Sequence, residues 1–203
     1  MAADFTVIVF TPEEPVSNEA RRIAQLLESG AADRVHLRHP ALSETDIRAI
    51  LESLPADLLP RITLHSHFEL TDRFPVGIHL NSRNPYPPED FAGTLSRSCH
   101  SLSELATKAD KFDYSTLSPI FNSISKSGYN AAFKLTDASL IQALKDSNVV
   151  ALGGVTPDRF HELHRAGFAG AAMLGYCWPD DPTLFANRIN ETLKARNSLC
   201  SNS

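Results

Sequence analysis

The 203-residue sequence has few cysteines, and these form no recognisable pattern. Cys99, Cys177 and Cys200 lie far apart, and none belongs to a CxxC pair. This spacing excludes a disulfide scaffold and a zinc-finger domain, and it fits a protein from a reducing compartment.

Long apolar runs and excess positive charge are also absent. No stretch approaches the ~20 apolar residues that cross a bilayer, and the N-terminus lacks the pattern of a secretory signal. The formal net charge is -5, which argues against nucleic acid and anionic membranes as partners. We therefore expect a cytoplasmic protein with small-molecule substrates, and a homo-oligomer remains open.

Eight β-branched or apolar runs alternate with helical patterns along the chain. Such alternation predicts a parallel sheet, and eight repeats without a second domain favour a compact α/β (β/α)8 TIM barrel over residues 1–196. Residues 197–203 are expected to be a frayed tail. The predicted strands are Phe5–Phe10, Arg34–Arg38, Arg61–His65, Val76–Leu80, Thr94–Ser98, Phe112–Leu117, 149–152 and Gly170–Leu174.

Helix signals fit between most of these strands. Ser17 is expected to cap a helix that Gly30 closes, and Ser43 with Asp46 three residues later is expected to open an amphipathic helix. Further helices are expected over Ser101–Ala109 and Lys134–Lys145, and the connecting helices after the third and fourth strands must be short.

Glycines follow the last two predicted strands. Gly153 and Gly154 precede Thr156-Pro157, a typical helix start, and Gly175 follows the eighth strand. The last two strands of a TIM barrel often carry a phosphate site, so we expect these glycines to bind phosphate. A plain strand-to-helix turn is the alternative.

Polar residues gather at the ends of the other strands, where a TIM barrel has its active site. By period-two alternation His36 and Arg38 share one face, as do His65 and His67. Arg38 is a candidate anion clamp, or it pairs with a neighbouring carboxylate. The further candidates at strand ends are His39, His79, Ser98 and His100.

A long polar loop follows the sixth strand. Ser123, Ser125 and Lys126 in this loop could hold a diphosphate through hydrogen bonds and charge. Long loops in compact domains often act as lids, although a solvated surface loop has the same composition.

The order and spacing of these motifs resemble the thiamine phosphate synthase/TenI family over nearly the whole chain. The resemblance implies a TIM barrel, thiamine biosynthesis and a thiazole phosphate ligand. It also implies a Mg2+-dependent coupling of hydroxymethylpyrimidine diphosphate to thiazole phosphate, with release of pyrophosphate. The segments that carry it are Val35-His36-Leu37-Arg38, Gly77-Ile78-His79-Leu80, 96–104, Asp113-Tyr114, Ser118-Pro119-Ile120-Phe121, Lys126 and Leu152-Gly153-Gly154-Val155.

By position, the resemblance implies catalytic roles for Arg38 and Lys126, and phosphate binding at Gly153, Gly154 and Gly175. It implies substrate binding by Ser98 and by two loop hydroxyls, Ser123 and Ser125, which replace threonines of the family. His36 and His65 are expected to line the pyrimidine end of the pocket.

Several positions depart from the family pattern. His36 replaces a glutamine and Pro40 a lysine, His65-Ser66 replaces an Asn-Asp pair, and Asn84 replaces a second aspartate. Mg2+ prefers carboxylates, so Asn84 is the remaining candidate metal ligand and the substrate's diphosphate would otherwise hold the ion.

Two other functions are therefore open. One is a TenI-type thiazole tautomerase with His65 or His100 as general base, although Pro119 replaces the histidine that the family's tautomerases use. The other is a non-catalytic barrel that binds thiazole or thiamine phosphate.

Six histidines fall at or near strand ends on one side of the expected barrel, so some are predicted to converge. We favour neutral, hydrogen-bonding histidines over a bound transition metal. If the rings converge, ligand affinity should change as the pH falls through about 6.

Overall fold

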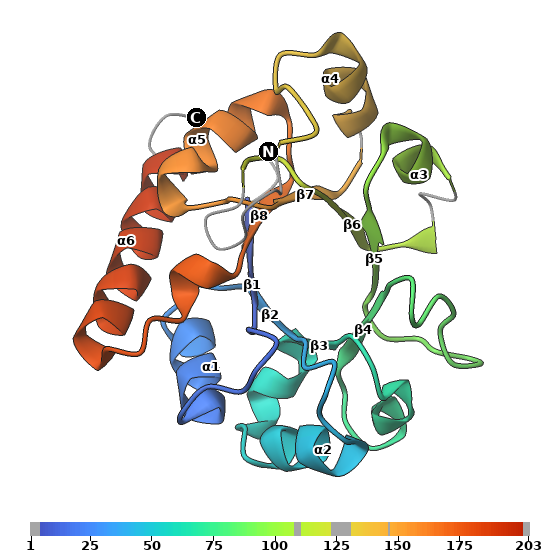
Figure 1. Ribbon diagram of the computed structural model, residues 1–203, viewed down its shortest axis with the longest axis vertical. Helices are drawn as coiled ribbons and strands as arrows, with labels where there is room; N and C mark the ends of the chain where they lie inside the picture. Colours follow the sequence, from blue (N-terminus) through green and yellow to red (C-terminus); the bar gives the residue numbers. More distant parts are fainter. Residues whose placement is uncertain (1–4, 108–110, 123–130, 146, 201–203) are drawn as a thin grey trace.

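The chain folds into a single closed barrel of eight parallel strands, seen end-on in Figure 1. The structure is a computed structural model, which describes residues 5–107, 111–122, 131–145 and 147–200. Each strand pairs with the next, and β1 pairs with β8 to close the ring. The strands are β1 (Thr6–Phe10), β2 (Arg34–Leu37), β3 (Ile62–Leu64), β4 (Gly77–Leu80), β5 (Leu95–Cys99), β6 (Tyr114–Leu117), β7 (Val149–Leu152) and β8 (Gly170–Met173).

The predicted TIM barrel is therefore confirmed, and all eight predicted strands are present with ends that differ from the prediction by at most two residues. Helices surround the strands on the outside (Figure 1). No helix in the described part of the chain is long and apolar enough to cross a membrane. The helices are α1 (Glu19–Glu28), α2 (Glu44–Glu52), α3 (Leu102–Ala106), α4 (Ala138–Leu144), α5 (Phe160–Ala166) and α6 (Pro182–Cys200).

Two helix starts follow the sequence signals, and α1 and α4 start later than predicted. Ser43 and Asp46 form a capping box at the predicted start of α2, and Ser101 caps α3. The prediction that Ser17 caps α1 is wrong, because the helix starts one residue later, after Asn18 in a left-handed conformation with φ 55°. Asn tolerates this conformation better than most residues do.

The connecting helix is short after β3 and missing after β4, in line with the prediction of short helices here. A short 3-10 helix, η2 (Phe68–Asp72), follows β3, and the segment 81–94 after β4 contains no helix. α3 and α4 are also shorter than the predicted helices.

The predicted frayed tail is wrong for residues 197–200, which continue α6. Leu199 is buried, and the Arg196 guanidinium donates to the Gly30 carbonyl at 2.6 Å and to Asp33 Oδ1 at 2.9 Å. These contacts fix the end of α6 on the barrel, and composition alone does not reveal them.

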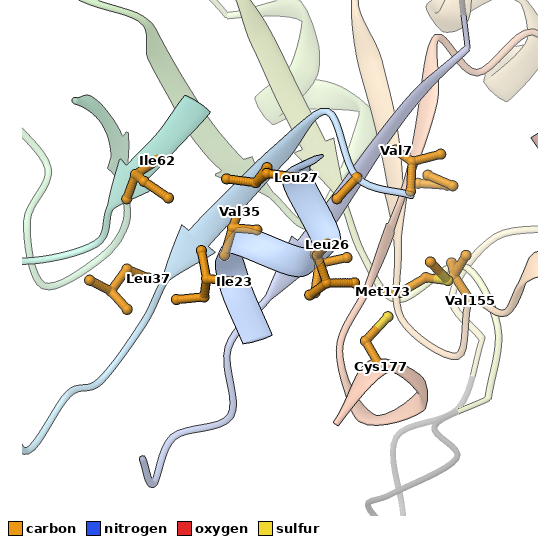
Figure 2. Close-up of a cluster of buried hydrophobic side chains, with 14 of the residues drawn as sticks. Val7, Ile23, Leu26, Leu27, Val35, Leu37, Ile62, Val155, Met173 and Cys177 are labelled. Carbon is orange, nitrogen blue, oxygen red and sulfur yellow. The ribbon is translucent and has the colours of Figure 1, made fainter. Parts of the chain in front are cut away.

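The main hydrophobic core lies between the outer face of the strands and the helices. Every second strand residue points outward into it, and α1 contributes its apolar side. Figure 2 shows Ile23, Leu26 and Leu27 of α1 beside Val35 of β2. This layer is apolar over most of the ring, and Arg97 with Ser115 interrupts it between β5 and β6.

The inside of the barrel has two different halves. Ile8, Phe10, Val150 and Ala172, from β1, β7 and β8, form a small apolar cluster. The inward positions of β2 to β6 are polar, whereas a TIM barrel interior is usually filled by branched apolar residues. The polar half supplies the candidate site.

Candidate active site

Three imidazole rings meet inside the polar half of the barrel. The ring centroids of His65 and His79 are 4.5 Å apart. The ring centroid of His36 lies 5.1 Å from that of His65 and 4.9 Å from that of His79. Phe10 stacks on His36 with centroids 4.4 Å apart and closes one side of the group. The predicted convergence is thus confirmed for these three histidines, which we call the histidine cluster.

Hydrogen bonds connect the histidine cluster to neighbouring strands. His36 Nδ1 lies 2.9 Å from His65 Nε2, and His36 Nε2 lies 2.5 Å from the Tyr114 hydroxyl. His79 contacts Ser96 Oγ at 2.8 Å through Nδ1 and Ser98 Oγ at 2.9 Å through Nε2. Five strands, β2 to β6, therefore position one polar network.

The electrostatics of the cluster keep its imidazoles neutral. Burial lowers the pKa of His36 and His65 well below the ordinary value, and neighbouring imidazoles lower both further. Burial also lowers the pKa of His79 to about 3. The rings are neutral at pH 7 as predicted, but the expected titration near pH 6 is wrong for them because desolvation disfavours the charged form.

The other histidines near strand ends lie outside the cluster. His39 Nε2 lies 2.9 Å from buried Glu19 Oε2. His67 contacts the Leu42 carbonyl at 3.0 Å, and His100 contacts Ser118. His67 does not share a face with His65, because β3 ends at Leu64 and His67 itself has a left-handed φ of 54°.

The glycine pair forms a tight turn at the end of β7. Gly153 and Gly154 have φ values of 97° and 63°, which L side chains rarely adopt. A Cβ on Gly154 would lie 2.2 Å from the Asn122 carbonyl oxygen, so the pair packs against the loop after β6. Phe121 N–H donates to the Gly153 carbonyl at 3.0 Å and fixes this contact.

The turn leads into the helix start that the sequence indicates. Pro157 is the first residue of the 3-10 helix η4 (Pro157–Arg159), which continues into α5. Gly175 opens the 3-10 helix η5 (Gly175–Cys177) after β8, and the Trp178 indole N–H fixes this segment to the Phe10 carbonyl at 2.7 Å. The three predicted phosphate-binding glycines thus follow neighbouring strands.

Arg38 follows the end of β2 and pairs with a carboxylate. Its guanidinium donates to Glu13 Oε1 at 3.1 Å, and both side chains are partly exposed. A phosphate that binds Arg38 would therefore compete with Glu13. Ser123, Ser125 and Lys126 lie outside the described residues, so their roles remain predictions.

The residues that replace the family's carboxylates do not fit a protein-held Mg2+. Asn84 Nδ2 donates to the His65 carbonyl at 2.9 Å, and Asn81 Nδ2 donates to the same carbonyl at 3.0 Å. These amides join the ends of β3 and β4. Ser66 offers a neutral hydroxyl, so this donor set lacks the carboxylate that Mg2+ prefers.

A cavity of about 480 Å3 lies away from the histidine cluster, at the amino ends of β4 and β5. Its walls include Phe74, Val76, Phe91 and Thr94. TIM-barrel chemistry takes place at the opposite, carboxyl ends of the strands, so we do not assign the candidate site to this cavity.

Sequence reasoning missed three residues that support the site. Tyr114 and Ser96 hydrogen-bond the histidine cluster, and Glu13 pairs with Arg38. Period-two alternation places Tyr114 and Ser96 inside the barrel, and it is the signal that could have found them. Glu13 lies in the loop after β1, where no periodic signal exists.

The family of the chain follows from its similarity to known proteins. The family described as thiamine monophosphate synthase (TMP-TENI) matches residues 7–176, which include β2 to β8 and all of β1 except its first residue. The chain belongs to this family. The sequence-based resemblance is therefore confirmed at the family level.

Individual members of the family are similar to different extents. A thiamine phosphate pyrophosphorylase structure from Bacteroides thetaiotaomicron is 32% identical with a TM-score of 0.82, over 95% of this chain and 98% of that one. One from Pyrococcus furiosus is 18% identical with a TM-score of 0.71, over 97% of this chain and 98% of that one, and shows the fold alone. The thiamine-phosphate synthase of Latilactobacillus sakei is 28% identical over 126 residues, 55% of this chain. This match spans 56% of that relative's length.

Proposed function

We propose that the chain couples hydroxymethylpyrimidine diphosphate to thiazole phosphate and releases pyrophosphate, as a thiamine phosphate synthase does. The observation that carries this proposal is the family match over residues 7–176, which covers both ends of the candidate site. The reaction breaks the bond between the pyrimidine methylene carbon and the diphosphate oxygen, and the thiazole nitrogen forms the new bond to that carbon.

The geometry suggests how the two substrates share the barrel. The thiazole phosphate would bind at Gly153, Gly154 and Gly175, where N–H groups and the helix start after β7 favour an anion. The Gly154 N–H donates to no other residue in the described part of the chain, which leaves it open to a ligand. The pyrimidine would then face His36, His65 and Ser98 on the polar half.

The chain's contribution to the rate would be stabilisation of the departing diphosphate. Arg38 supplies a planar guanidinium at the end of β2, and Lys126 with the hydroxyls of Ser123 and Ser125 would supply further donors. Binding the diphosphate at Arg38 would displace Glu13, which forms an ion pair with the guanidinium. No step in this account uses a metal held by the protein.

A turnover assay tests the proposal. Purified protein is incubated with both substrates, with and without Mg2+, and thiamine phosphate and pyrophosphate are measured. Formation of both products in equal amounts is expected. Binding of thiazole phosphate without turnover would overturn the coupling reaction and support the non-catalytic barrel.

Lys126→Ala tests the role of the loop in the same assay. Because Lys126 is proposed to stabilise charge that develops on the leaving diphosphate, turnover should fall by roughly 100-fold or more while thiazole phosphate affinity changes little. Lys145→Ala, at the exposed end of α4 and outside the loop, is the matched control and should leave both unchanged. Equal losses of turnover and affinity would contradict the assigned role.

A thiazole tautomerase is the second candidate, and the histidine cluster favours it. Tyr114, His36 and His65 form a continuous hydrogen-bonded series of neutral groups, which suits proton transfer without a metal. His65 would act as general base at the ligand end of this series. Incubation with the thiazole tautomer alone, without the pyrimidine substrate, separates the two reactions, because only the tautomerase converts it.

A further inference from the structure

Nothing in the proposed reaction requires three mutually touching imidazoles, yet the barrel brings them together. One ring nitrogen from each of His36, His65 and His79 lies within 4.8 Å of the other two, and all three side chains are buried. We propose that these residues bind a transition-metal ion of the Zn2+ class. The proposal goes beyond the proposed function, because metal binding is measured without either substrate.

The ligand chemistry selects this class of ion. Imidazole nitrogen is a good ligand for Zn2+, Co2+ and related ions, whereas Mg2+ prefers oxygen. Tetrahedral Zn–N bonds of about 2.0–2.1 Å place the ligating nitrogens roughly 3.3 Å apart. His36 Nδ1 and His65 Nε2 are now 2.9 Å apart, so a small rotation of the rings would admit an ion between them.

The hydrogen bonds around the cluster can fix which ring nitrogen carries each lone pair. Ser96 Oγ can donate to the Ile78 carbonyl at 3.3 Å and accept from His79 Nδ1–H. The lone pair of His79 would then lie on Nε2, beside Ser98 Oγ. Likewise, the Tyr114 hydroxyl can accept from His36 Nε2–H, which leaves the lone pair of His36 on Nδ1, opposite His65. Metal-bound histidines are held by such outer hydrogen bonds.

The surroundings of the cluster also suit a metal. His36 and His79 are fully buried, Phe10 covers one side, and His65 keeps 8% of its surface exposed. An ion would enter beside His65, and a water or ligand oxygen could take the fourth position there.

The experiment uses full-length protein made without a His-tag and stripped with a chelator. Titration with Zn2+ should show one ion per chain, and Co2+ should give the visible absorption of a nitrogen-coordinated ion that excess Mg2+ does not abolish. His65→Gln and His79→Gln should weaken Zn2+ binding by roughly 100-fold or more, and Tyr114→Phe by about 10- to 100-fold. His100→Gln, exposed and outside the cluster, is the matched control and should bind like the wild type.

A metal-free hydrogen-bonded network is the alternative that the same measurements detect. If the wild type binds less than one Zn2+ per chain, or if His65→Gln binds as tightly as the wild type, the proposal is overturned. Circular dichroism identifies a variant that fails to fold. His65 lies at the exposed edge of the cluster, so its variant and the wild-type stoichiometry decide the question even if His79→Gln does not fold.

Discussion

At the scale of single residues, the buried pair of His39 and Glu19 makes stability depend on pH. Burial lowers the pKa of His39, but the hydrogen bond and charge of Glu19 outweigh this, and the net pKa is raised. The pair is almost completely buried, and Glu19 Oε1 has no partner in the described part of the chain. A neutral His39 would leave the buried carboxylate without the imidazolium charge, with Arg22 as the remaining nearby cation.

Because the folded pKa of His39 is raised, its stabilisation is complete below the unfolded value of about 6.5 and is lost as the pH rises through the folded pKa. We expect the free energy of unfolding to fall over this range by on the order of 1 kcal/mol more in the wild type than in His39→Gln. Urea denaturation from about pH 6 to 9 measures it, a range that brackets the upward shift. An unchanged slope in His39→Gln would contradict the pairing.

A second residue-scale prediction concerns the glycine turn after β7. Gly154→Ala would place a Cβ 2.2 Å from the Asn122 carbonyl oxygen, so the loop after β6 must move. We expect weaker binding of thiazole phosphate, measured by calorimetry, in addition to lower stability. Gly30→Ala is the matched control, since φ is 77° and nothing lies within 4 Å.

In Gly30→Ala the free energy of unfolding should therefore fall by only about 1 to 2 kcal/mol, the cost of the left-handed backbone conformation. Its affinity for thiazole phosphate should stay the same. If Gly154→Ala binds the ligand as tightly as Gly30→Ala does, the turn is a plain strand-to-helix connection.

At the scale of elements, the N-terminal cap of α2 gives a direct test of the sequence signals. The Ser43 side chain accepts from Asp46 N–H, and the Asp46 side chain accepts from Ser43 N–H. Ser43→Ala should lower the free energy of unfolding by about 1 kcal/mol. Ser53→Ala, beyond the other end of α2, should change it by less than about 0.5 kcal/mol. Equal effects in denaturant titrations would mean that the box contributes nothing.

The elements were largely predictable because strands such as β1 and β7 are apolar, β-branched runs with turn signals beside them, and the other strands follow the same spacing. Helix ends were less predictable, since tertiary contacts decide whether a polar segment such as 197–200 stays helical. The glycines and strand-end histidines of the candidate site could be found from their places after strands. Their partners could not, because Tyr114 reaches His36 across the barrel, and one-dimensional periodicity gives no such pairing.

At the scale of the whole molecule, Arg196 joins the last helix to the first βα unit. Its guanidinium contacts Gly30 and Asp33, and Asp33 Oδ2 also accepts from Val7 N–H of β1 at 2.7 Å. Arg196→Ala should therefore lower the free energy of unfolding by about 1 to 3 kcal/mol. Arg188→Ala removes a surface pair with Glu191 in the same helix and should cost about 1 kcal/mol or less. A comparable loss in both variants would show that the contact does not fix α6.

Closure of the ring by β1 and β8 has a consequence for synthesis on the ribosome. The partners of residues 6–9 are residues 170–173. One edge of β1 therefore stays unpaired until β8 has been synthesised. At about 5 to 20 residues per second, the outer edge of β1 stays unpaired for roughly 8 to 33 seconds. The run Val7-Ile8-Val9-Phe10 is apolar throughout and would attract other nascent strands in that time. Slower translation of the second half of the chain should therefore increase aggregation of the newly made protein.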